Sequence, residues 1–383
     1  MDTLEPSTAE ETASVLGDAV RAKTRVAIHG GGTKLDWLAA PACDAVLSTA
    51  RLNRVIAHRH GDLTATVEAG ATLSSVNQAL AAHGQWIPLD PPWSDRATIG
   101  GIVAAADSGP RRHRYGSPRD LIIGVEIARP DGVRAKAGGI VVKNVAGYDL
   151  ARLVTGSFGS LGVILNATFK LYPLPAASAT VVVAASSSAV AAAVVAALNA
   201  SQLTPSAVEI EGVPLRVLVR FESTPASVAE QSRQAVRLAS ECGAHAEVVD
   251  GSGEQEAWSA HERRIWGTSG PVVKITLLPT GLGKALDVVE REAGEAAIAG
   301  RAALGVLFVR PADDTRVAPL VRALRARVEP GKGSAVVLRA SAALAREVDA
   351  WGPMGDALPV MRAVKKAFDP DGVLNPGRGP GGI

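Results

Sequence analysis

A short apolar segment, Arg25–His29, runs directly into three consecutive glycines, Gly30–Gly32, which Thr33 and Lys34 follow. The apolar run predicts a β-strand, and the glycines permit a turn whose backbone N–H groups converge on an anion. A Walker loop is excluded because Thr33 precedes Lys34, and the Rossmann fingerprint is excluded because Leu35 occupies the position of its last glycine. The chain must therefore build a phosphate loop of another architecture, unless the glycines form a plain turn.

Further glycine-rich or basic segments follow along the first half of the chain. In residues 90–104, the pair Gly100-Gly101 stands among small and branched residues, which suits either a backbone close to a flat or anionic ligand or close helix packing. Residues 108–120 hold four arginines, His113 and Tyr115, and they read as partners for phosphate or carboxylate or as a solvated basic loop. Residues 143–150 predict a specified turn, and residues 159–164 enter a strand that could offer its backbone to an adenine edge.

Composition narrows the class of protein. A formal net charge of +2 over 383 residues gives no reason to expect nucleic acid as the main partner, although the arginines of 111–119 leave a DNA binder as an outside alternative. Only two cysteines, Cys43 and Cys242, are present, so we expect no iron–sulfur cluster and no metal site. The uncharged stretch 171–208 is long enough to span a bilayer, but its prolines and serines favour a strand (180–185) followed by a helix (189–199), and we expect no integral membrane span.

The hydrophobic pattern divides the chain into parts. In the first part it predicts helices at 12–23 and 73–83 and strands at 63–68, 121–129 and 161–171, closed by Pro173 and Pro175. In the second part it predicts strands near 180–185, 206–211, 215–222, 272–278, 301–309 and 334–339, and helices near 187–199, 225–242, 253–266, 283–293 and 314–327. This alternation indicates an antiparallel sheet covered by helices, with no recognisable sequence repeat. A helix at 358–368 and a turn-rich stretch at 369–378 end the chain.

Taken as an ordered set, these motifs and the C-terminal stretch 368–378 resemble the FAD-linked oxidases of the vanillyl-alcohol-oxidase type. Within them, the chain is similar to the smaller FAD-binding subunit (E subunit) of bacterial glycolate oxidase. The resemblance covers residues 25–175 and 357–378 well, and the middle only in outline. It implies an α+β protein with a two-lobed FAD-binding domain of the PCMH type at 1–175. An α+β cap or substrate domain with an antiparallel sheet would follow at 176–345, and a C-terminal segment, 346–383, would return to the FAD domain.

The resemblance also implies which residues hold the cofactor. His29 and the loop up to Lys34 would bind the pyrophosphate, whereas residues of 91–104 would line the flavin and its ribityl chain. Residues of 109–116 would sit beside the cofactor, residues of 162–164 would hold its adenine end, and Asn375 would return from the C-terminus. The cofactor-binding residues are thus expected to be His29, Gly30, Gly31, Gly32, Thr33, Lys34, Pro91, Thr98, Ile99, Gly100, Gly101, Ala104, Gly109, Tyr115, Gly116, Gly162, Val163, Ile164 and Asn375.

Two departures from the family bear on the chemistry. Covalently flavinylated relatives carry a histidine just after the glycine pair, where Thr33 stands here, so we expect a dissociable, non-covalent FAD. Relatives that oxidise 2-hydroxy acids carry a Gly-Glu-His-Gly-type segment in the cap, and this chain lacks it. The catalytic candidates are therefore His261 as base and Arg263 or Arg264 as the carboxylate partner, unless the segment is simply an amphipathic helix with Trp258 and Trp266 packed inward.

The function that the resemblance implies is the oxidation of glycolate or another 2-hydroxy acid by a multi-subunit FAD-dependent oxidoreductase. The partners would be a larger FAD-binding glycolate oxidase subunit and an iron–sulfur subunit, and the electrons would pass from the flavin to the iron–sulfur subunit or to another acceptor. Two alternatives stay open: a stand-alone oxidoreductase acting on D-lactate or a similar acid, and a flavin-fold scaffold without turnover. The acidic start of the chain is not a signal peptide, which predicts a cytoplasmic protein, or one peripheral at the inner face of the cell membrane through its complex.

Overall fold

The computed structural model describes residues 2–38, 40–139, 148–331 and 333–383, and the chain divides into two units. The first unit comprises residues 1–109, 115–174 and 353–383. The second comprises residues 110–114 and 175–352. Most of the predicted turn at 143–150 lies outside the described residues.

The first unit contains a small lobe built on a parallel sheet of order β1-β3-β2, formed by β1 (Asp2–Leu4), β2 (Val26–His29) and β3 (Ala45–Ser48). Helix α1 (Ala9–Arg21) packs Leu16 onto Val26 and Leu47. This helix begins three residues before the predicted position 12, because the Thr8 side chain accepts a hydrogen bond from the Glu11 N–H and caps it.

The larger lobe of the first unit is a five-stranded antiparallel sheet of order β4-β5-β9-β7-β8. Its strands are β4 (Val55–Arg59), β5 (Thr64–Glu68), β7 (Ile122–Ala128), β8 (Arg134–Gly138) and β9 (Val163–Lys170). Helices α2 (Leu73–Ala81), α3 (Ile99–Ala105), α5 (Pro118–Leu121) and α6 (Leu150–Val154) pack on it. Leu80, Ile102, Ile127 and Phe169 are fully buried in the shared core. A two-stranded ladder joins β6 (Gln85–Trp86) to β10 (Tyr172–Pro173), and α13 (Ala357–Phe368) lies near the C-terminus.

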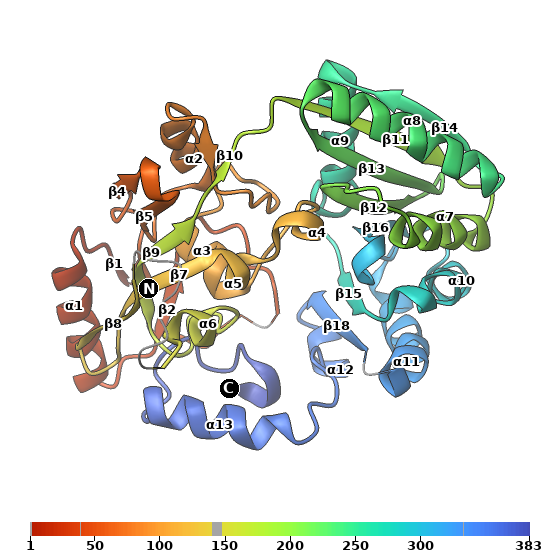
Figure 1. Ribbon diagram of the computed structural model, residues 1–383. Helices are drawn as coiled ribbons and strands as arrows, with labels where there is room; N and C mark the ends of the chain where they lie inside the picture. Colours follow the sequence, from red (N-terminus) through yellow and green to blue (C-terminus); the bar gives the residue numbers. More distant parts are fainter. Residues whose placement is uncertain (1, 39, 140–147, 332) are drawn as a thin grey trace. The chain divides into compact units, whose positions relative to one another are not determined.

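The second unit is built on an eight-stranded antiparallel sheet of order β14-β11-β13-β12-β16-β17-β15-β18, drawn in green to blue in Figure 1. Its strands are β11 (Ala177–Ala184), β12 (Ala207–Gly212), β13 (Arg216–Ser223), β14 (His245–Val249), β15 (Val272–Thr276), β16 (Ala297–Arg301), β17 (Val306–Arg310) and β18 (Ser334–Arg339). Its helices are α7 (Ser188–Ala200), α8 (Pro225–Glu241), α9 (Gly251–Trp266), α10 (Leu282–Ala293), α11 (Val317–Val328) and α12 (Leu344–Glu347). The short α4 (Arg112–Tyr115) begins in the segment 110–114. The predicted α+β class with an antiparallel sheet is confirmed.

The sheet of the second unit is a duplication that the sequence does not reveal. The order β11-α7-β12-β13-α8-β14 gives the spatial order β14-β11-β13-β12, and β15-α10-β16-β17-α11-β18 gives the same order reversed. Each half is a ferredoxin-like βαββαβ unit. The halves join where β12 pairs antiparallel with β16. Helix α9 lies outside both repeats, in the connection between them.

The two faces of this sheet differ in chemistry. Val208 and Ile210 of β12 point into the apolar core under α7 and α10. Because side chains alternate along a strand, Glu209 and Glu211 point to the opposite face, and there they pack against His261 of α9. Both glutamates are buried, so the second face is a covered polar surface.

Two differences from the predicted elements have a clear physical reason. The single strand predicted at 301–309 is a hairpin, because Ala302–Leu304 form a turn and Gly305 adopts a left-handed conformation between β16 and β17. Strand β14 was missed because it is a mostly exposed edge strand. The uncharged stretch 171–208 forms β10, β11 and α7, and among the described residues no helix is long and apolar enough to cross a membrane.

Candidate functional site

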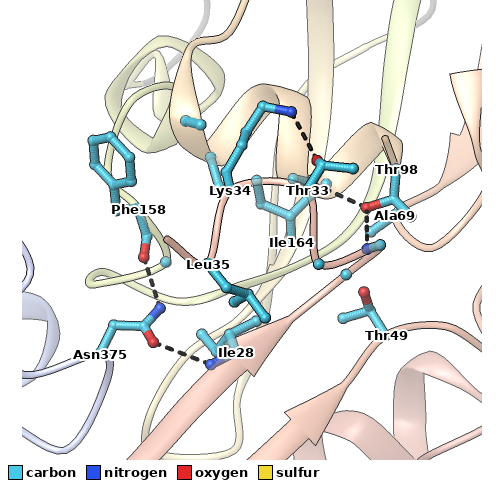
Figure 2. A pocket seen from close by; sticks show the side chains of 18 of the residues that line it. Ile28, Thr33, Lys34, Leu35, Thr49, Ala69, Thr98, Phe158, Ile164 and Asn375 are labelled. Carbon is cyan, nitrogen blue, oxygen red and sulfur yellow. Dashed lines mark hydrogen bonds between the residues drawn. The ribbon is translucent and has the colours of Figure 1, made fainter. Parts of the chain in front are cut away.

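A pocket in the first unit gathers most of the predicted cofactor-binding residues. It encloses about 660 Å³, part of it open to solvent. Its walls come from the end of β2, the glycine loop, α3, residues 158–164 and the C-terminal segment, which Figure 2 shows converging. Segments far apart in the sequence therefore build one site.

The glycine loop passes so close to its neighbours that side chains would not fit. A Cβ atom on Gly30 would overlap the Thr98 hydroxyl, and one on Gly31 would overlap the backbone carbonyl of Arg96. Gly32 has a φ of +74°, in the left-handed region that glycine adopts without cost. The Gly31 N–H donates to the Thr98 hydroxyl at 3.3 Å, which ties the loop to the start of α3.

Helix α3 forms a second wall. Thr98 caps it by accepting a hydrogen bond from the Gly101 N–H at 3.4 Å. Gly100 lets the helix approach Ala69 after β5, since a Cβ atom on Gly100 would lie 2.8 Å from the Ala69 side chain. Ala104, one turn further along α3, also lines the pocket, and its small side chain leaves space there.

Asn375 fixes the C-terminal segment against the pocket. Its side-chain oxygen accepts from the Ile28 N–H at 3.1 Å, and its side-chain nitrogen donates to the Phe158 carbonyl at 2.6 Å (Figure 2). The backbone of Val26 exchanges hydrogen bonds with the Val373 carbonyl and the Asn375 N–H, so this segment lies beside β2. Asn375 therefore holds the chain around the pocket.

The pocket wall contains two buried cations in different electrostatic settings. Lys34 forms an ion pair with the buried carboxylate of Asp107 at 3.0 Å and also donates to the Thr33 hydroxyl. Arg378 donates to the backbone carbonyls of Lys34 and Trp37. Near the loop, burial lowers the pKa of His29, and the positive charge of Arg378 lowers it further, so this imidazole is neutral at pH 7.

The predicted cofactor residues divide into two sets. Those lining the pocket are Gly30, Gly31, Gly32, Thr33, Lys34, Thr98, Gly100, Gly101, Ala104, Gly162, Ile164 and Asn375. Those outside it are His29, Pro91, Ile99, Gly109, Tyr115, Gly116 and Val163. Ile99 and Val163 are fully buried in the cores, and Tyr115 packs against the rings of Trp86 and Tyr172 at 5.9 and 5.1 Å between centroids.

Several pocket residues were not predicted. They are Ile28, Leu35, Thr49, Ala69, Ala105, Phe158, Gly159 and Arg378. For most of them the sequence carries no signal, because small or apolar residues next to a motif look like ordinary packing. Arg378 is different, since it ends the C-terminal stretch 368–378 that carries the family resemblance.

The catalytic candidate His261 lies in the second unit, buried between two carboxylates. Its Nε2 is 3.0 Å from Glu209 and its Nδ1 is 3.1 Å from Glu211. Burial alone would lower the pKa of His261, but the hydrogen bonds with these carboxylates raise it to about 8. At pH 7 the ring is therefore an imidazolium that donates to both carboxylates, with no lone pair left to accept a proton.

The two candidate arginines have structural partners. Arg263 is exposed on α9 and pairs with Glu256 at 2.7 Å. Arg264 donates to the Gly212 carbonyl at 2.9 Å and contacts the Glu211 carboxylate at 3.3 Å. The alternative interpretation of this segment was an amphipathic helix with Trp258 and Trp266 packed inward. The structure agrees with it in part, because the Trp266 ring packs on that of Phe308.

The basic segment 110–114 belongs to the second unit, and its side chains contact the polar face of the sheet. Arg111 pairs with the buried Glu222 at 2.7 Å, and Arg114 donates to the Glu222 backbone carbonyl. Burial lowers the pKa of His113, while the nearby charge of Glu209 acts to raise it. Within the described residues, the buried His113 Nδ1 and Glu209 Oε1 have no hydrogen-bond partner. Among the described residues, no three or more His, Cys, Asp or Glu side chains gather in a way that could hold a metal ion.

Family comparisons agree with this geometry. Residues 3–148 match the family model described as FAD binding domain, and residues 351–378 match the C-terminal domain of FAD linked oxidases. These matches together cover less than half of the chain, and they support the superfamily of FAD-linked oxidases with a PCMH-type FAD-binding domain that the ordered motifs predict.

Individual relatives give the scale of the similarity. The chain is 36% identical over 167 residues to glycolate oxidase subunit GlcE of Escherichia coli, which covers 43% of this chain and 47% of that protein. It is 34% identical over 171 residues to a D-lactate dehydrogenase of Archaeoglobus fulgidus, covering 44% and 38%. The match thus spans less than half of either relative. An alkyldihydroxyacetonephosphate synthase structure has the same fold, with a TM-score of 0.73, 16% identity and coverage of 98% of this chain and 75% of that one.

Proposed function

We propose that the chain binds FAD in the pocket of the first unit and works as the FAD-binding subunit of a glycolate or related 2-hydroxy acid oxidase complex. Electrons would pass from substrate through the flavin to a partner iron–sulfur subunit or another acceptor. The observation that carries the proposal is the pocket itself, in which the predicted glycine loop, α3 and Asn375 meet. The likeness to the E. coli glycolate oxidase subunit supports the substrate class and the complex.

The residues present fit FAD. A diphosphate needs convergent backbone N–H groups and a nearby cation, and the loop Gly30–Gly32 and Arg378 offer both. The apolar side chains of Ile28, Phe158 and Ile164 suit the faces of flat rings. When bound, the flavin would accept a hydride from the substrate carbon, which leaves the protein to orient the substrate and to take up one proton.

FAD is expected to dissociate from the protein on acid precipitation. Thr33 occupies the position of the histidine that carries flavin in covalent relatives, and His29 precedes the glycines. His29 does not line the pocket. Trichloroacetic acid should therefore leave a colourless pellet and free FAD in the supernatant, measured by its absorbance. A yellow pellet would contradict the non-covalent assignment.

The function as a whole is tested by the visible spectrum of the purified protein and chromatography of its released cofactor. We expect FAD, and bleaching of the flavin by glycolate under anaerobic conditions when the partner subunits are present. Correctly folded protein that is colourless and does not bind added FAD would refute the proposal.

The likeness to a D-lactate dehydrogenase supports a second candidate, a stand-alone oxidoreductase for D-lactate or a similar acid. Steady-state turnover by the isolated chain would favour it over the subunit. A flavin that stays oxidised when substrate is added to the assembled complex would instead favour the scaffold without turnover.

A further inference from the structure

Arg378 is a buried cation whose charge the surrounding protein does not balance. Its side chain is 5% exposed, and its Nε atom has no hydrogen-bond partner among the described residues. Its terminal nitrogen donates to the backbone carbonyls of Lys34 and Trp37, which are neutral acceptors. In the described part of the chain, the carboxylate that acts on its charge is that of Asp36, which is exposed to solvent.

Lys34, the cation predicted from the sequence, has the opposite character. It is 8% exposed and lies 3.0 Å from the Asp107 carboxylate, which is equally buried. This pair is neutral as a whole, so its field at an anion in the pocket is weak. An unbalanced buried charge is costly unless a counter-charge arrives, and of the two cations only Arg378 gains one when an anion binds.

The guanidinium is held in place at the end of the glycine loop. Its hydrogen bond to the Lys34 carbonyl fixes it two residues beyond Gly32, and it lies over the Phe158 ring at 5.8 Å from the centroid. Asn375 binds the same C-terminal segment to Ile28. A cation already fixed in position loses little entropy when its ligand binds.

The same segment is anchored from behind by a second buried ion pair. Lys365 of α13 donates to the Asp369 carboxylate at 2.6 Å and to the carbonyls of Ser160 and Leu374. Asp369 in turn accepts from the backbone N–H groups of Val373 and Leu374. These hydrogen bonds fix the turn before Arg378 to α13 and to Ser160.

We propose that Arg378, and not Lys34, is the cation that neutralises the diphosphate of FAD, which makes the C-terminal segment 369–378 part of the cofactor site. The inference rests on the proposed function, because it takes FAD as the ligand. It adds that the Lys34–Asp107 pair supports the loop without binding the cofactor. Guanidinium groups suit this task because they form two parallel hydrogen bonds to phosphate oxygens.

The experiment compares three ligands on FAD-stripped protein: FAD, ADP and riboflavin. ADP carries the diphosphate without the flavin, and riboflavin carries the flavin without phosphate. In Arg378→Met the dissociation constants for FAD and ADP should rise on the order of 100-fold, as expected when one partner of a buried charge pair is removed. The constant for riboflavin should stay within about threefold of wild type. Fluorescence titration measures FAD and riboflavin, and calorimetry measures ADP.

The comparison variant is the double variant Lys34→Met/Asp107→Asn, which removes the other buried cation together with its counter-charge. Because this pair supports the loop, the variant should weaken FAD and ADP binding, but by about tenfold less than Arg378→Met does. Arg378→Lys keeps the charge but not the fork geometry and should lie between wild type and Arg378→Met. If Arg378→Met does not fold, Arg378→Lys decides: wild-type affinity for FAD and ADP would then overturn the inference.

The outcomes separate this inference from the proposed function. Wild-type protein that binds neither FAD nor ADP would refute FAD binding itself. Wild-type protein that binds both, with Arg378→Met equally tight or with the Lys34/Asp107 variant as weak as Arg378→Met, would overturn the role of Arg378 alone. A purely structural role predicts that Arg378→Met weakens riboflavin binding as much as FAD and ADP binding, whereas our inference predicts that riboflavin binding is retained.

Discussion

Replacing Gly31 by alanine is expected to weaken FAD binding by about 100-fold or more. The new Cβ would overlap the Arg96 carbonyl oxygen, so the loop has to move away from the segment before α3. The hydrogen bond from the Gly31 N–H to the Thr98 hydroxyl would break with this movement. Losing about two backbone hydrogen bonds to a charged diphosphate, at about 1.5–3 kcal/mol each, gives an effect of this size.

The control for Gly31→Ala is Gly61→Ala. Gly61 lies in the short turn His60–Asp62, and a Cβ atom added there meets nothing within 4 Å. Both variants remove the conformational freedom of one glycine, so a difference between them reports the close approach at the loop. Fluorescence titration with FAD gives the affinity, and circular dichroism shows whether the variants fold. Gly31→Ala protein that is folded and binds FAD as tightly as Gly61→Ala would show that the cofactor does not contact this loop.

The glycine loop could be predicted from the sequence because its requirement is local. Three glycines after a strand indicate a turn with unusual backbone angles or close backbone approach, whichever residues lie opposite them. Arg378 could not be predicted in the same way, since its position depends on a hydrogen bond to the carbonyl of Lys34, 344 positions away in the sequence. Lys34 was predicted instead, because the sequence does not show that Asp107 pairs with it.

The fold of the second unit illustrates the same limit. Helices with a clear apolar face, such as α8 and α10, were predicted within one residue at each end, because the 3.6-residue period is visible in any single segment. The duplication was not predicted. Two ferredoxin-like halves need the same order of elements and the same apolar spacing, and many different sequences satisfy both.

The role of His261 could not be predicted from the sequence, because it depends on which carboxylates are buried beside the imidazole. In the sequence it stands on an amphipathic helix beside two arginines, which suggests a base near a carboxylate site. The glutamates that bind it, Glu209 and Glu211, alternate with apolar residues in β12, a pattern that normally indicates a solvent-facing side. Helix α9 covers that side, and the three charges become buried together.

The stability of the protein is expected to fall by about 2 kcal/mol as the pH rises from 6.5 to about 9, through loss of the His261 proton. The pKa of His261 is about 8 in the folded protein, against 6.5 for an unperturbed histidine. A group whose pKa is raised by folding contributes fully below its unfolded value, and its contribution disappears as the pH passes the folded value. The shift between the two values sets the size of the effect.

The two other histidines with shifted pKa values, His29 and His113, affect stability in a different pH range. Burial lowers the pKa values of His29 and His113, so folding disfavours their protonation and they reduce stability only below pH 6.5. Urea unfolding followed by circular dichroism at several pH values therefore isolates His261 above that pH. In His261→Asn the free energy of unfolding should no longer fall between pH 6.5 and 9, because the group that releases the proton is gone. In the control His245→Asn, on the exposed edge strand β14, it should fall as in wild type. If His261→Asn declines as steeply as wild type, then the folded protein does not hold this histidine as an imidazolium between Glu209 and Glu211.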